Sequence, residues 1–179
     1  GESNMKLSVF NAPGALAVSL SLLAGTAMAG SHMAPDAVAV PEGNQKAFTT
    51  MAQGTVAWVC KDADMGAAWT FAGPAAVLSD EDGNPVISYY GPPATWEAMD
   101  GSKVTGTQLA TAPAGDGNIP YQLVEANPSE KDGWLKGTTY IQRLNLDGGA
   151  APQTGCGADD IGKKVLVAYT GEYVFWKAE

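Results

Sequence analysis

The sequence predicts an all-β fold: an antiparallel β-sandwich or a barrel-like single domain of about ten strands, with one disulfide. From Ala34 onward, short runs rich in Val, Ile, Thr and aromatic residues alternate with Gly, Pro, Asn and Asp, which favour turns. No segment keeps its apolar residues at a helical period for long. Strands joined by turns therefore account for the chain better than helices.

Each candidate strand is bounded by turn residues. In chain order the candidates are residues 45–52, 55–60, 67–73, 75–80, 85–91, 94–99, 103–110, 121–126, 137–146, 163–170 and 172–178. Asp82-Gly83 indicates a hairpin, because Gly readily adopts the positive φ of a tight turn. Residues 34–44 contain prolines that exclude a central strand, so we expect an extended lead-in there.

The N-terminal segment has the pattern of an export signal. Met5-Lys6 precede a short apolar run that ends in small residues, with cleavage expected before Gly30. A retained anchor or amphipathic arm is the alternative, although the run is shorter than the roughly 20 apolar residues of a transmembrane helix. We expect a signal peptide with cloning residue at its start over 1–29, a lead-in or expression scar over 30–44, and one β-rich domain over 45–179. A secreted or periplasmic location follows.

The chain is acidic, with ten Lys and Arg against 19 Asp and Glu and a formal net charge of -9. This balance disfavours nucleic acid and, after signal cleavage, an anionic membrane, since both attract clustered Lys and Arg. A small molecule or a carbohydrate is the expected ligand, and the oligomeric state is left open.

Two cysteines, Cys60 and Cys156, make up the whole cysteine content. An even count in an exported chain predicts one disulfide, with two buried or metal-binding thiols as the alternative. The bridge would close most of the domain and stabilise it by about 4 to 5 kcal/mol in the chain-entropy view.

Histidine is absent from the expected domain, because the only one, His32, precedes it. An imidazole-activated nucleophile and a histidine-based zinc or copper site are therefore excluded, and no glycine motif for phosphates or dinucleotides appears. We expect no metal site and no cofactor, and a binding or structural module rather than an enzyme.

The stretch GPPATWEAMDGSKVTG, residues 91–106, holds the remaining catalytic candidates. Glu97 and Asp100 flank a turn beside Trp96, and two carboxyl groups suffice for glycoside hydrolysis when one stays protonated. The alternative is a core tryptophan and a turn that Asp100 caps. Trp96, Glu97, Asp100 and the neighbouring Tyr90 are also candidate ligand-binding residues.

Three oxygen donors, Asp80, Asp82 and Asn84, alternate in the predicted hairpin loop. They match part of a calcium loop, but the bidentate Glu that would complete it is missing. The hairpin explains them better.

Arg143 is the only arginine in the chain and shares a strand face with Thr139 and Ile141. A buried arginine requires a partner, so we expect an ion pair with Glu125 on the neighbouring candidate strand. The alternative is that Arg143 lines a pocket and binds an anionic ligand.

The five tryptophans could form a platform for sugar rings, but such residues more often fill the core of a β domain. We expect core positions for four of them and an exposed loop position for Trp134. The four are Trp58, Trp69, Trp96 and Trp176.

Five motifs in this order resemble the secreted bacterial and fungal proteins grouped as domain of unknown function 3455. The motifs are GPPATWEAMDGSKV, IPYQLVEA, TYIQRLN, GGAAPQTGC and YTGEYVFW. The resemblance runs from about Val40 to Trp176 and implies an exported, single-domain, β-rich protein. It also implies that Cys60 and Cys156 match the two characteristic cysteines of that family.

The chain departs from the family pattern in one place. Relatives commonly have a histidine just before their Gly-Pro-Thr-Trp-Glu stretch, whereas this chain has Ser88, Tyr89 and Tyr90, followed by extra residues in GPPATWE. A role that needs that histidine is not transferred. The shared positions, without an assigned role, are Gly91, Trp96, Glu97, Asp100, Gly101 and Ser102.

The expected function is binding of a carbohydrate or small ligand through aromatic faces and Arg143. One alternative is a carboxylate-based hydrolase that uses Glu97 and Asp100. The other is an interaction or assembly protein of the cell envelope, which would present an exposed strand edge or apolar patch.

Overall fold

The computed structural model describes residues 34–179, so the expected signal peptide and residues 30–33 lie outside the described range. No helix within that range is long and apolar enough to cross a membrane. The all-β prediction is confirmed. The elements are the 3-10 helices η1 (Asp36–Val38) and η2 (Ala158–Asp160) and the strands β1 (Asn44–Ala63), β2 (Gly66–Ser79), β3 (Pro85–Tyr90), β4 (Thr95–Ala98), β5 (Lys103–Ala112), β6 (Tyr121–Ala126), β7 (Thr138–Gly148) and β8 (Lys164–Ala178).

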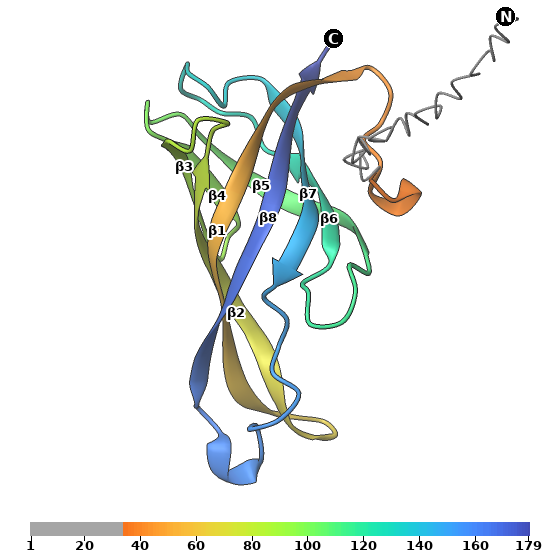
Figure 1. Ribbon diagram of the computed structural model, residues 1–179, viewed down its shortest axis with the longest axis vertical. Helices are drawn as coiled ribbons and strands as arrows, with labels where there is room; N and C mark the ends of the chain where they lie inside the picture. Colours follow the sequence, from red (N-terminus) through yellow and green to blue (C-terminus); the bar gives the residue numbers. More distant parts are fainter. Residues whose placement is uncertain (1–33) are drawn as a thin grey trace, which may run out of the picture. The chain divides into compact units, whose positions relative to one another are not determined.

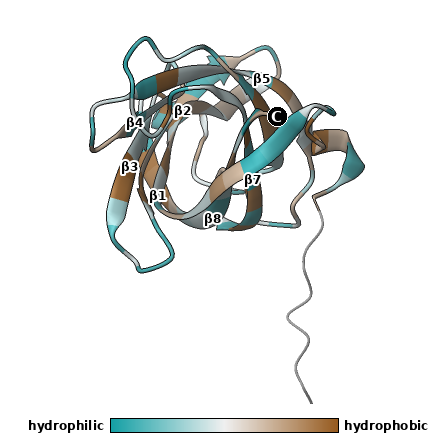
Figure 2. Ribbon diagram, turned by 90° about the horizontal axis from the view of Figure 1, so that it is seen from above, coloured by the Kyte–Doolittle hydropathy of each residue, from teal (hydrophilic) through white to brown (hydrophobic). Residues whose placement is uncertain are grey.

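The eight strands form one antiparallel sheet that closes into a barrel. Every strand pairs with its neighbours in the sequence, and β1 also pairs with β8, from Asn44 opposite Ala178 to Val59 opposite Lys164. Figure 1 shows β1 and β8 side by side along most of their length, and in Figure 2 the strands close into a ring. Of the two predicted architectures, the barrel is the one that forms.

The strand count is eight rather than about ten, because three pairs of candidate strands are continuous. β1 joins the candidates 45–52 and 55–60, β2 joins 67–73 and 75–80, and β8 joins 163–170 and 172–178. The residues at the joints are Gly54, Pro74 and Gly171, which the sequence presents as breaks.

Glycine at two of these joints lets the strands curve into the barrel. Gly54 lies between the buried Ala52 and Val56 on the inner face of β1, and a Cβ there would lie 2.5 Å from the Cα and Cβ of Ala76. A Cβ at Gly171 would lie 2.6 Å from Cδ2 of Leu146. A side chain at either position would therefore force the strands apart.

Pro74 is tolerated beside an irregularity in the pairing of β1 and β2. Ala57 pairs with Gly73, but the next residue, Trp58, pairs with Phe71, so β2 contains an extra residue. A β-bulge of this kind interrupts the hydrogen-bond ladder and increases the local twist, which gives proline a place inside a strand.

Alternate residues of all eight strands fill the interior of the barrel. Tyr89 stacks on Trp96 with ring centroids 4.6 Å apart, and Phe48 stacks on Phe175 at the same distance. Other interior residues with almost no exposed surface are Val56, Leu78, Ile87, Val104, Leu135, Ile141 and Tyr173.

The lead-in packs on the outside of the barrel. Val38 of η1 is fully buried against Leu123, Leu144 and Val174, which lie on the outer faces of β6, β7 and β8. The carbonyl oxygen of Val38 accepts a hydrogen bond of 2.7 Å from Gln142 Nε2. The region expected to be an extended lead-in thus includes one 3-10 turn and covers a second, smaller apolar cluster.

The predicted disulfide is confirmed and lies where β1, β2 and β8 extend beyond the other strands (Figure 1). Cys60 of β1 is bonded to Cys156 in the segment between β7 and β8, with Cα atoms 5.4 Å apart. Two indole N–H groups hold the same segment: Trp69 donates to the carbonyl of Thr154, and Trp58 donates to that of Gly149, each at 3.0 Å.

Substitution of Gly54 by alanine should destabilise the barrel, because the added methyl group meets backbone on β2 that cannot rotate away. We expect Gly54→Ala to lower the free energy of unfolding in urea by about 1–3 kcal/mol. Gly157→Ala is the control, since its Cβ would lie 3.6 Å from the nearest atom and its φ of -112° suits alanine. Equal stabilities of the two variants would contradict the close approach of β1 and β2.

Removal of the disulfide should destabilise the fold, because the bridge spans a sequence separation of 96 residues. The double variant Cys60→Ser/Cys156→Ser should lose about 2–5 kcal/mol in urea unfolding. Wild-type protein unfolded in excess dithiothreitol provides the comparison and should match the variant. A variant as stable as the oxidised wild type would show that the bridge is dispensable.

Candidate ligand-binding site

Tyr90, Glu97 and Lys103 form a cluster on the outside of the barrel. Tyr90 Oη donates a hydrogen bond of 2.7 Å to Glu97 Oε2, and Lys103 Nζ lies 3.3 Å from the same oxygen. Strand register explains the contact, because Glu97 of β4 is paired directly with Lys103 of β5. The hydrogen bonds from Tyr90 and Lys103 lower the pKa of the Glu97 carboxyl group.

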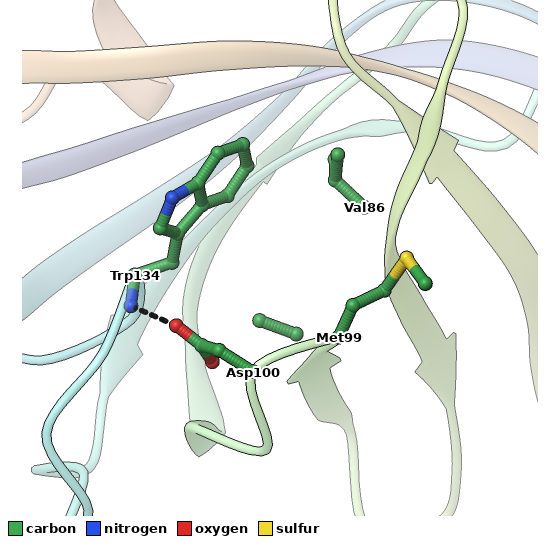
Figure 3. A pocket seen from close by; sticks show the side chains of 5 residues that line it. Val86, Met99, Asp100 and Trp134 are labelled. Atoms are coloured by element: carbon green, nitrogen blue, oxygen red, sulfur yellow. Dashed lines mark hydrogen bonds between the residues drawn. The ribbon is translucent and has the colours of Figure 1, made fainter.

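Asp100 fastens two loops together at one end of the barrel. Its Oδ1 accepts hydrogen bonds from Ser102 Oγ at 2.6 Å and Ser102 N at 2.8 Å, and its Oδ2 accepts one from Trp134 N at 2.7 Å. Figure 3 shows this carboxylate directed at the backbone of Trp134. The hydrogen bond from the Ser102 side chain, followed by those from the two backbone amides, lowers the pKa of Asp100 to about 2.

These two carboxyl groups give the hydrolase alternative no support. A general acid must keep its proton near neutral pH, which requires a raised pKa. The pKa values of Glu97 and Asp100 are both lowered, and each carboxylate is occupied by neighbouring donors. Asp100 therefore serves the turn, as the simpler sequence interpretation expected.

A cavity of about 220 Å³ lies beside Asp100. Val86, Ala98, Met99 and Trp134 line it, and Figure 3 shows Val86 on the opposite side from the indole of Trp134. Trp134 is 48% exposed, as predicted for a loop residue. The polar group at this cavity is the Asp100 carboxylate, whose oxygens already accept hydrogen bonds.

The other tryptophans differ in their burial. Trp96 is fully buried, as predicted, and its indole nitrogen has no hydrogen-bond partner. Trp58, Trp69 and Trp176 are only half-buried. Trp58 and Trp176 pack against the edges of the two apolar clusters, whereas Trp69 belongs to neither, so the prediction of a core position is wrong for Trp69. The indole N–H groups of Trp58, Trp69 and Trp176 donate to carbonyl oxygens of Gly149, Thr154 and the Gln142 side chain, respectively.

The hairpin interpretation of Asp80 is confirmed. Asp80 Oδ1 accepts hydrogen bonds from the backbone N–H groups of Asp82 and Asn84 at 3.1 and 2.8 Å, and Gly83 has a positive φ of 83°. Within residues 34–179 no group of three or more His, Cys, Asp and Glu side chains is arranged to hold a metal ion.

Arg143 points into the barrel, on the same face of β7 as the interior residue Ile141. It is only 9% exposed. Its Nε and Nη2 donate hydrogen bonds of 3.2 and 2.8 Å to the carbonyl oxygen of Pro120. All ion pairs among the described residues involve lysines. The guanidinium group of Arg143 therefore has no carboxylate of these residues within 4.0 Å.

The predicted ion pair between Arg143 and Glu125 is wrong. The register of β6 and β7 places Gln122, not Glu125, opposite Arg143. Glu125 lies three residues further along β6, so its side chain points to the outer face and is exposed. The guanidinium group is consequently a buried cation whose neighbours are neutral.

A second cavity, of about 300 Å³, opens in front of Arg143. This cavity and the Asp100 cavity lie at opposite ends of β4. Ala94, just before the strand, lines the Arg143 cavity, and Ala98, the last residue of the strand, lines the Asp100 cavity. Arg143 is the only cationic side chain in its wall. The remaining lining residues are Val56, Trp58, Phe71, Pro74, Tyr89, Pro92, Ala94, Gln108, Ile119, Pro120, Gln122 and Tyr169.

Three tyrosines lie around the guanidinium group. Tyr169 Oη and Tyr173 Oη are hydrogen-bonded at 3.1 Å. Burial raises the pKa of Tyr169 to about 12 and also raises those of Tyr89 and Tyr173, while the charge of Arg143 opposes the rise in each case. All three are therefore neutral hydroxyl groups at physiological pH, and none supplies the missing negative charge.

Two glutamines complete the polar part of the wall. Gln122 Nε2 donates a hydrogen bond of 2.6 Å to Gln108 Oε1. Gln122 Oε1 is buried and has no hydrogen-bond donor. The cavity wall thus contains one cation without an anion.

The structure separates the predicted site residues into different places. Tyr90 and Glu97 meet on the outer surface, Asp100 lies in a turn, Trp96 is in the core, and Arg143 faces the cavity. Sequence reasoning missed most of the cavity wall. Alternation along β8 could have placed Tyr169 and Tyr173 on one inner face, but no sequence signal indicates which strands surround Arg143.

Comparison with known proteins identifies one family. The model of the family described as protein of unknown function (DUF3455) matches residues 41–177. No curated protein and no solved structure matches the chain.

Acid should weaken the contribution of Asp100 to stability. Its pKa is 3.8 ordinarily and about 2 in the fold, so its contribution is complete above pH 4 and is lost as the pH falls through about 2. Asp100→Asn should therefore lower the melting temperature at pH 7, and its difference from wild type should shrink between pH 4 and pH 2.

The matched control is Asp116→Asn, which changes an exposed aspartate on another loop. Its difference from wild type should stay small across the same pH range. A difference between Asp100→Asn and wild type that persists at pH 2 would contradict the role of the ionised carboxylate.

Proposed function

Because the chain belongs to the DUF3455 family, which has no assigned function, we propose its function from the site: binding of a small organic anion in the barrel cavity. One observation carries the proposal. The guanidinium group of Arg143 is buried, faces a cavity of about 300 Å³ and has no carboxylate partner among the described residues.

The energetics of a buried charge favour an anionic ligand. Taking a cation out of water is costly unless an anion and hydrogen bonds compensate for the lost hydration. The groups that contact Arg143 are neutral, namely the carbonyl oxygen of Pro120 and the hydroxyl group of Tyr173. A carboxylate can accept two parallel N–H bonds from a guanidinium group, which gives both strength and orientation.

The cavity is suited to a single negative charge on a mostly apolar molecule. One cation lines it, so a phosphate or dicarboxylate would leave negative charge unpaired. Most of the remaining wall consists of aromatic, proline and aliphatic residues, as in typical small-molecule sites. A neutral sugar would leave the buried guanidinium group without an anion, so of the two expected ligand classes, a carbohydrate and a small molecule, a small organic monoanion fits better.

We place this activity outside the cytoplasm, in a secreted or periplasmic protein. The N-terminal sequence pattern supports export. The Cys60–Cys156 disulfide supports it too, because such bonds persist in oxidising compartments.

Anion binding is tested by comparing charged ligands with neutral ones of the same shape. Benzoate and hexanoate should bind the wild-type protein at least about tenfold more tightly than benzamide and hexanamide, since a hydrogen bond to a charged group contributes about 1.5–3 kcal/mol. Isothermal titration calorimetry measures the affinities, and Trp58 in the cavity wall provides a fluorescence signal.

Variants of the cation provide the second half of the test. Arg143→Gln should remove the preference for the carboxylates, and Arg143→Lys should retain part of it. Glu97→Gln is the control, because Glu97 lies on the outer surface and should not affect binding. Equal affinity of the wild type for benzoate and benzamide would refute the proposal even if the Arg143 variants failed to fold.

A further inference from the structure

We infer that the anion bound in the Arg143 cavity is an aromatic monocarboxylate, whose ring packs against Phe71 and Trp58 while its carboxylate binds Arg143. The inference rests on the proposed function, anion binding at Arg143, and names the class of anion. Three features carry it: the β-bulge that turns Phe71 toward the cavity, the aromatic surface that remains uncovered there, and the size of the cavity.

The β-bulge in β2 decides which way Phe71 points. Phe71 and Pro74 both line the cavity, although they are three residues apart in the strand. In a regular strand an odd separation places two side chains on opposite faces of the sheet. The extra residue of β2 opposite Ala57 and Trp58 removes this difference, so both side chains face inward. Without the bulge, Phe71 would point to the outside of the barrel.

Phe71 remains uncovered although it faces the cavity. It is 52% exposed, and its ring meets that of Trp58 edge to face with centroids 5.8 Å apart. Trp58 is itself only half-buried. A phenyl ring stabilises a fold in proportion to the area that it removes from water, and about half of this ring contributes nothing in that way. An apolar group of a ligand would cover it.

The aromatic groups around the cavity are held in place before any ligand binds. The Trp58 ring is fixed by a hydrogen bond of 3.0 Å from its indole nitrogen to the carbonyl oxygen of Gly149, and Tyr89 is held by stacking on Trp96. Three proline rings line the same space. Preformed flat surfaces of this kind contact an aromatic ring better than a flexible chain, because ring pairs have favoured stacked and edge-on geometries.

The size of the cavity fits one ring with a carboxylate. A cavity of about 150 Å³ is enough to hold benzene. The Arg143 cavity is about 300 Å³, which leaves room for a ring and its charged group. It is at the lower end of the range for small-molecule sites, so a long acyl chain or an oligosaccharide would not be enclosed.

The cation and the uncovered rings come from different strands of the wall. Arg143 belongs to β7, whereas Trp58 belongs to β1 and Phe71 to β2. A ligand that contacts all three needs one charged end and one flat apolar end. An aromatic monocarboxylate has both, whereas an aromatic dicarboxylate would place a second charge against apolar side chains.

The test measures the affinity of the full chain for benzoate, cyclohexanecarboxylate and hexanoate by isothermal titration calorimetry. The three ligands have the same charge and similar size, and only benzoate has an aromatic ring. Benzoate should bind about 2–10-fold more tightly than either of the others. Equal affinities of the wild-type protein for the three ligands would overturn the inference without recourse to any variant.

Variants assign the preference for a ring to Phe71. Phe71→Leu keeps an apolar side chain but removes the ring, so it should reduce the preference for benzoate over cyclohexanecarboxylate at least about twofold. Phe71→Tyr keeps the ring and should retain the preference. The position is 52% exposed and therefore tolerant of both changes.

Tyr90→Leu is the matched control. It removes a partly exposed aromatic ring from the outside of the barrel, where Tyr90 contacts Glu97, and should leave the preference at the wild-type value. A preference that survives in Phe71→Leu, or that falls equally in Tyr90→Leu, would overturn the inference.

The outcomes separate this inference from the proposal beneath it. Carboxylates that bind without any preference for a ring would refute the aromatic ligand and leave anion binding intact. Carboxylates that bind no better than their amides would refute both.

Discussion

Closure of the sheet by β1 and β8 is the constraint on which the rest of the molecule depends. The two strands lie at opposite ends of the described chain and pair from Asn44 opposite Ala178 to Val59 opposite Lys164. Once this pairing forms, the sheet has an inside, and every inward residue faces residues from strands across the barrel. The stacked core and the cavity in front of Arg143 both result from that enclosure. Gly54 and Gly171 permit it, because both strands must bend where side chains would collide.

Local sequence patterns predicted which segments form strands and turns, but they predicted the ends of the strands less well. Alternation and turn residues identified the strands, Asp82-Gly83 identified the hairpin, and the cysteine count identified the bridge. The breaks expected at Gly54 and Pro74 did not occur, because closure requires long strands that bend instead of ending. Strand ends depend on long-range packing, which a short window of sequence does not contain.

The candidate site was predictable only in part, for a related reason. The composition of residues 91–106 drew attention to Glu97 and Asp100, which serve a surface cluster and a turn. Arg143 could be assigned to an inner face, but its partner could not, since a shift of a few residues along β6 exchanges an outward Glu125 for an inward Gln122. The site is a product of register across several strands rather than of any motif along one.

The two ends of the barrel also differ in how they are filled. Trp96, Tyr173 and Phe175, all fully buried, occupy the space between the loop fastened by Asp100 and the cavity of Arg143. The Arg143 cavity and the Asp100 cavity share no lining residue, so they are two separate hollows at opposite ends of β4. A substitution that fills one hollow therefore leaves the walls of the other as they are, and each can be altered on its own.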